Sequence, residues 1–107
     1  MIVQHWVLGG ETPILEPDLL KWAEWFEAAN RDRVVQTTIL KDCEISTVFL
    51  GLDYRLIGDG PPLLFETMVF GGQHDGAQWR YSTRDEAEAG HNAAVALVRA
   101  GGEEAGE

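Results

Sequence analysis

The chain has 107 residues, the size of a single domain, and carries 18 acidic against 8 basic side chains, a formal charge of −10. The few, scattered cations exclude a binder of duplex nucleic acid, because phosphate backbones are bound by clustered Lys and Arg. No apolar run reaches the ~20 residues of a membrane helix. The N-terminus is not that of a signal peptide, and Cys43 is the one cysteine. We therefore expect a folded cytoplasmic protein without a membrane partner.

The first third of the chain predicts a strand, a loop and a helix. Residues 2–8 are apolar and β-prone, which is typical of a strand. A loop is expected between Pro13 and Pro17. A helix then begins at Pro17, with Asp18 in its first turn. Its apolar stripe follows helical spacing and comprises Leu19, Trp22, Ala23, Phe26 and Ala29.

The rest of the chain predicts four strands and a second helix. Strands are expected at residues 34–40, 44–52, 63–70 and 77–81, and their short connections favour antiparallel neighbours. Thr83 followed by Glu86 is a capping box that starts the last helix. One face of that helix is apolar and includes Ala87, His91, Ala94, Val95 and Val98.

These elements, in the order β-α-β-β-β-β-α, predict a two-layer α+β fold with an antiparallel sheet of about four or five strands and two helices. We expect one domain over residues 1–100 and a disordered, acidic, Gly-rich tail over residues 101–107. Alternation along residues 44–52 gives that strand two partly apolar faces. Either the two helices cover opposite faces, or one face binds a partner, for which a homodimer is one arrangement.

Four stretches of the chain have specific sequences: residues 22–27 (WAEWFE), residues 47–53 (TVFLGLD), residues 61–72 (PPLLFETMVFGG) and residues 81–91 (YST followed by EAEAGH). Together they resemble a family of small phage and prophage proteins, over most of residues 20–95. The resemblance implies a phage origin and a location in the host cytoplasm, and it supplies no catalytic residue. The chain departs from the family pattern at residues 54–57, because the family often has a histidine directly after the aspartate.

Few side chains are candidates for chemistry. Glu66 interrupts an apolar strand, so it either enters a pocket or pairs with an arginine such as Arg80 or Arg55 on a neighbouring strand. His74-Asp75 lies in a Gly-rich loop and either contributes to a metal or acid–base site or forms the turn. For His91, on the apolar helix face, a core role with hydrogen-bonded ring nitrogens is expected. No metal-site spacing occurs, and no cofactor is predicted.

Large aromatic side chains are the other binding candidates. Trp25 flanks the apolar stripe of the first helix, Trp79 lies near the edge of the predicted sheet, and Tyr54 follows the strand at residues 44–52. Such rings are enriched at binding hot spots, although they also fill cores. The predicted binding residues are therefore Trp25, Trp79, Tyr54, Glu66, His74 and Asp75.

Three functional hypotheses follow. The first is a non-enzymatic phage accessory protein that binds a host protein or a small metabolite or nucleotide, and so modulates host processes or defence. The second is a small enzyme with a pocket that uses Glu66 or His74-Asp75. The third is an acidic mimic of nucleic acid, which needs rows of Asp and Glu on one surface. A flat apolar face favours binding, and converging polar groups in a cavity favour an enzyme.

Overall fold

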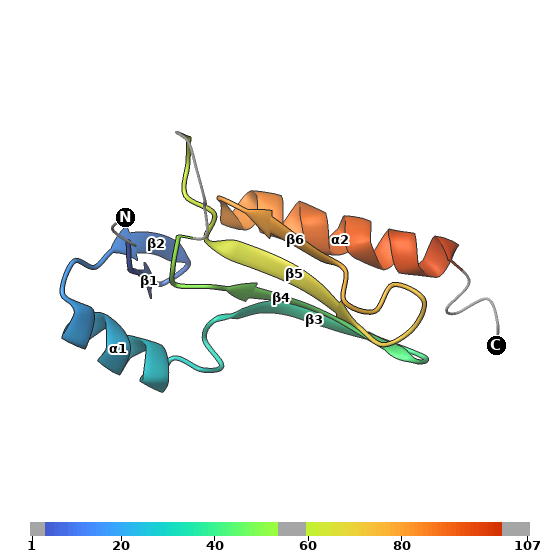
Figure 1. The fold of residues 1–107 in the computed structure, drawn as a ribbon, viewed down its shortest axis with the longest axis horizontal. Helices are drawn as coiled ribbons and strands as arrows, with labels where there is room; N and C mark the ends of the chain where they lie inside the picture. Colours follow the sequence, from blue (N-terminus) through green and yellow to red (C-terminus); the bar gives the residue numbers. More distant parts are fainter. Residues whose placement is uncertain (1–3, 54–59, 102–107) are drawn as a thin grey trace.

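The structure is a computed structural model that describes residues 4–53 and 60–101. It confirms the α+β class, with two antiparallel sheets and two helices (Figure 1). The elements are β1 (Trp6–Gly9), β2 (Thr12–Leu15), α1 (Leu19–Ala28), β3 (Val34–Leu40), β4 (Cys43–Phe49), β5 (Phe65–Phe70), β6 (Gln78–Tyr81) and α2 (Arg84–Ala100). Strands β3 to β6 form one sheet in chain order. Neither helix has the length and apolar character needed to cross a membrane.

The N-terminal strand pairs locally instead of joining the main sheet. Residues predicted as a loop form β2, which pairs with β1 as a two-stranded hairpin. Pro13 lies within β2, opposite Leu8. A proline has no N–H for a ladder, but each strand of a two-stranded sheet has a free edge, so the proline is tolerated there. The proline signal therefore led the prediction to a loop where an edge strand forms.

Helix α1 lies at one end of the main sheet, next to the hairpin, and not across a face of the sheet (Figure 1). Asp18 is its N-cap, one residue outside the helix, and its carboxylate accepts from the amides of Leu20 at 2.9 Å and Lys21 at 3.2 Å. The Trp22 indole donates to the carbonyls of Trp6 at 3.0 Å and Gly51 at 3.1 Å. These bonds tie α1 to β1 and to the chain just after β4.

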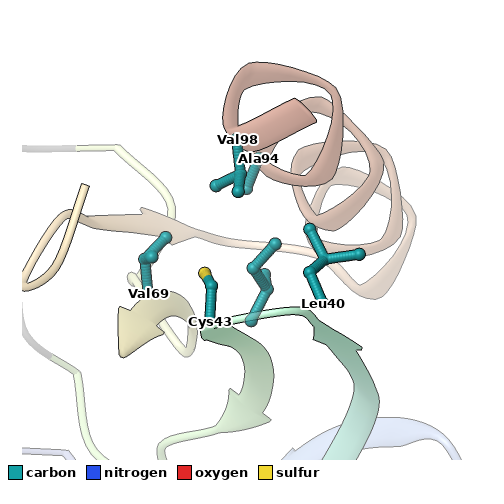
Figure 2. Close-up of a cluster of buried hydrophobic side chains, with 6 residues drawn as sticks. Leu40, Cys43, Val69, Ala94 and Val98 are labelled. Atoms are coloured by element: carbon teal, nitrogen blue, oxygen red, sulfur yellow. The ribbon is translucent and has the colours of Figure 1, made fainter. Parts of the chain in front are cut away.

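Helix α2 covers one face of the four-stranded sheet and builds the core. The predicted capping box at Thr83 and Glu86 is confirmed. So is the predicted apolar face, since Ala87, Ala94 and Val98 are buried. Figure 2 shows Ala94 and Val98 of α2 above side chains of β3, β4 and β5. A second cluster lies nearer the start of α2 and comprises Phe49, Leu64, Phe65 and Ala87, with Trp25 and Tyr81 packed against it.

A polar network lies inside this apolar layer. His91 is fully buried, and its ring nitrogens bond two threonine hydroxyls: Nε2 lies 2.8 Å from Thr38 Oγ1, and Nδ1 lies 2.7 Å from Thr47 Oγ1. The Thr47 hydroxyl also bonds that of Thr67 at 2.5 Å. The core role predicted for His91 is confirmed. The network joins α2 to three neighbouring strands.

Gly90 allows α2 to approach β6 closely. A Cβ atom at this position would overlap the ring and hydroxyl of Tyr81. Gly90→Ala is therefore expected to lower the free energy of unfolding by about 1–2 kcal/mol, since the clash outweighs the higher helix propensity of alanine. In a Tyr81→Ala background the same change is expected to raise it by roughly 0.5–1 kcal/mol. Urea unfolding of the four proteins measures this change of sign, and equal effects in both backgrounds would contradict it.

Candidate functional site

The face of the four-stranded sheet that points away from α2 is the main candidate surface. Directly opposed residues in antiparallel strands share a face, and Ile45, Thr47 and Phe49 of β4 face α2. Side chains alternate along a strand, so Glu44, Ser46 and Val48 of β4 point away from α2. The residues of β3 and β5 that pair with these three point the same way, as do the residues of β6 that pair with those of β5. We call this surface the open face. Its residues are Val34, Thr37, Ile39, Glu44, Ser46, Val48, Glu66, Met68, Phe70, Gln78 and Arg80.

The apolar side chains of the open face belong to β3, β4 and β5, whereas the two residues from β6 are polar. Ile39 is 76%, Phe70 48% and Val34 44% exposed, so none of the described elements covers them. Val48 and Met68 lie between them and are half-buried. Large exposed apolar side chains on one face of a sheet are candidates for contact with another molecule. Of the two arrangements that the alternation left open, the structure has one helix on the sheet, and no element in the described part of the chain covers the other face.

Glu66 lies on the open face and forms an ion pair. Its Oε2 atom lies 3.0 Å from Nε of Arg80 on the adjacent strand β6. The predicted cross-strand pairing with Arg80 is therefore observed. Residue Arg55, the other partner considered, lies outside the described residues, as does Tyr54. The Glu66 carboxylate is therefore engaged by a neighbouring guanidinium in a cross-strand pair.

The loop that contains His74 and Asp75 is built as a turn. The Asp75 carboxylate accepts from the Gly71 amide at 2.6 Å, so it closes the loop on itself. His74 lies against Gly101, at the end of α2. Glu66 and this loop are at opposite ends of β5, roughly 16 Å apart along the strand. The structure therefore does not bring Glu66 together with His74 and Asp75. In the described parts of the chain, no three His, Cys, Asp or Glu side chains come together as metal ligands.

The two predicted binding tryptophans lie in different places. Trp25 is half-buried and packs edge-on against Phe49, with ring centroids 5.9 Å apart. Trp79 is 37% exposed on β6, on the side of the sheet that faces α2, and lines a shallow apolar pocket with Tyr81 and Leu97. Neither ring lies on the open face. The exposed side chains on the open face, Ile39, Val34 and Phe70, were not among the predicted binding residues. The apolar residues on both faces of the strand at residues 44–52 did predict that one face could bind a partner.

Comparisons of the chain with protein-family models, with curated proteins and with solved structures find no match.

Proposed function

We propose that this chain is a small, non-catalytic binding protein that docks a protein partner on the open face of its sheet. The observation that supports the proposal is the exposure of Ile39 and Phe70 on one side of a sheet whose other side is packed under α2. A domain with one helix layer leaves such a face free for another molecule. The resemblance to phage proteins suggests that the partner is a bacterial host protein.

Charge favours a basic partner over a second copy of the chain. Arg80 neutralises Glu66 in the ion pair, so Glu44, which lies between Ile39 and Phe70 in register, leaves the open face with a net negative charge. The whole chain carries −10. Two copies would therefore repel each other at long range, whereas a basic protein would be attracted. We infer that the interface of the partner protein has an apolar centre and carries Lys or Arg at its rim.

Substitutions on the open face test the proposal. Ile39→Asn and Phe70→Asn remove exposed apolar area without changing the charge or the core. Each is expected to weaken binding of the partner by about tenfold or more, as for a residue near the centre of an interface. Leu20→Asn is the control, because Leu20 is 75% exposed on α1 and lies outside the open face.

The measurement is capture from a bacterial lysate with the four immobilised proteins, followed by calorimetry with the purified captured protein. The proposal predicts a basic partner that Leu20→Asn retains, that both open-face variants lose, and whose affinity falls as salt is raised. Equal binding to all four proteins would overturn it. So would light scattering that shows a dimer for the unmodified chain and a monomer for Ile39→Asn, because the open face would then be a contact between two copies.

A further inference from the structure

A pocket lies near the C-terminal end of α1, away from Ile39 and Phe70 of the open face. It is a pocket of about 480 Å³ where the turn of the β1–β2 hairpin, helix α1, the connection from α1 to β3 and the start of α2 meet. We call it the junction pocket. Its lining includes Glu11, Trp25, Arg31, Asp32, Val34 and Arg84. Its volume is within the usual range for small-molecule sites.

Two guanidinium groups line this pocket in a chain that has few cations. Arg31 is exposed and forms no ion pair with any residue that the structure describes. Arg84 is held from one side, since its Nε atom lies 3.2 Å from Glu88. Its Nη2 atom is 3.7 Å from the carboxylate of Glu11, which is too long for a hydrogen bond. Guanidinium edges of this kind bind phosphate or carboxylate oxygens in pairs.

The Glu11 carboxylate near Arg84 indicates that this guanidinium binds an anionic group of a ligand. The Glu11 side chain is 75% exposed, on the hairpin turn, and reaches Arg84 only at this long distance. An exposed ion pair of this geometry contributes little to the stability of the fold. The Glu11 carboxylate is therefore a loosely held anion that a better-placed anion can displace.

The pocket lining also includes aromatic and apolar side chains. The Trp25 ring is fixed by its edge-on contact with Phe49, and its indole N–H has no partner within the described residues. Val34, 44% exposed, extends the apolar wall. A fixed tryptophan face is a surface for stacking a planar ring. Asp32 adds an exposed carboxylate that accepts hydrogen bonds from hydroxyl or amino groups.

We propose that the junction pocket binds a small anion that carries a planar ring, of the chemical class of a nucleoside monophosphate. Arg31 and Arg84 hold the phosphate, Trp25 stacks on the base, and Asp32 accepts from the sugar or the base. The Glu11 carboxylate leaves Arg84 when the phosphate arrives. This site is distinct from the docking surface on the open face: Arg31, Arg84, Trp25 and Asp32 lie outside that face, Val34 alone borders both, and the ligand is different.

Calorimetry on the full chain, with adenosine 5′-monophosphate as the probe, tests the proposal. Adenosine and inorganic phosphate are the matched part-ligands. We expect the monophosphate to bind with a Kd below about 1 mM, and each part-ligand to bind at least about tenfold more weakly, since each loses one wall of the site. A parallel 1H–15N spectrum should show the indole N–H signal of Trp25 shifting on addition of the monophosphate.

Three variants of the pocket and one control variant separate the site from the general charge of the protein. Arg31→Gln and Arg84→Gln are each expected to weaken binding by about five- to tenfold, and Glu11→Gln to strengthen it by about twofold or more. Lys41→Gln removes the same charge from the exposed β3–β4 turn and is expected to leave the affinity unchanged. Because Arg31 is exposed and forms no ion pair with the residues that the structure describes, Arg31→Gln should leave the fold intact, which a thermal melt checks.

Three results would overturn the proposal. One is the absence of monophosphate binding at 5 mM probe, about fivefold above the expected limit of Kd. The second is an equal loss of affinity for Lys41→Gln and Arg31→Gln, because the phosphate would then respond to net charge alone. The third is weaker binding by Glu11→Gln, because the Glu11 carboxylate would then not compete with the phosphate for Arg84. Binding that survives in Ile39→Asn, together with loss in Arg31→Gln, separates this site from the open face.

Discussion

Replacing His91 with leucine is expected to lower the free energy of unfolding by about 2–4 kcal/mol, mostly because hydrogen-bonding groups are left unpaired in the core. His91 is fully buried and bonds Thr38 and Thr47 through its two ring nitrogens. Leucine has a similar size but supplies neither partner. Thr47 keeps its bond to Thr67, whereas the hydroxyl of Thr38 loses its bond to the ring.

A double-mutant cycle with Thr38→Val identifies the cause of this loss. In the unmodified chain, Thr38→Val leaves the Nε2 atom of His91 without its partner. In the His91→Leu background that cost is gone, so the second substitution should cost at least about 1 kcal/mol less there. Urea unfolding of the four proteins gives the coupling. Additive losses would mean that the effect of His91 comes from packing volume and not from the hydrogen bonds.

His91 also gives the stability a defined dependence on pH. Burial lowers the pKa of His91 in the folded protein below its ordinary value of about 6.5. Below pH 6.5 the unfolded chain therefore binds a proton that the folded protein does not, and stability falls as pH falls, by up to about 1.4 kcal/mol per pH unit until the folded-state pKa is reached. Above about pH 7 this residue adds no pH dependence. His91→Gln is the control, because glutamine is polar but does not titrate. The difference between the two pH profiles isolates His91 from His5, His74 and the carboxylates.

The elements that depend on local sequence could be predicted, and those that depend on distant contacts could not. The capping box at Thr83 and the apolar face around His91 follow from side chains within a few residues of each other, and both are confirmed. The strand β3 was predicted with its observed bounds because its β-branched run is continuous. The place of α1 was not predictable, since the carbonyls that hold its Trp22 indole belong to Trp6 and Gly51, which are far away along the chain.

The same division holds for the candidate sites. Alternation along β4 indicated that both faces of the sheet carry apolar side chains, and one of these faces is not covered by residues 4–53 and 60–101. Which aromatic side chains are exposed was not predictable: Trp25 was expected beside the packed stripe, yet it contacts Phe49 in the core. The junction pocket has no sequence signal at all. Arg31 and Arg84 are 53 positions apart, and only the fold brings their guanidinium groups to one pocket.

Gly71 is the position at which we expect the largest effect of adding one methyl group. Its φ angle is +88°, in the left-handed region that favours glycine, and a Cβ atom would lie 2.5 Å from the carbonyl oxygen of Asp42. That oxygen belongs to the backbone of the β3–β4 turn, so it cannot rotate away as a side chain does. Gly71→Ala must therefore bear backbone strain and also push two turns apart. We expect the free energy of unfolding to fall by about 3–5 kcal/mol.

Gly76, in the same loop, is the matched control. Its φ angle is +87°, almost that of Gly71, but no heavy atom beyond its two chain neighbours lies within 4 Å of the position that a Cβ would occupy. Gly76→Ala therefore bears the backbone strain without the clash and is expected to cost about 1–2 kcal/mol. Urea unfolding of the two variants, at one pH and temperature, gives the difference of roughly 2–3 kcal/mol that is due to the contact with Asp42. Equal losses would mean that the turn around Asp42 yields freely. The close approach of these two turns would then not hold the end of the sheet together.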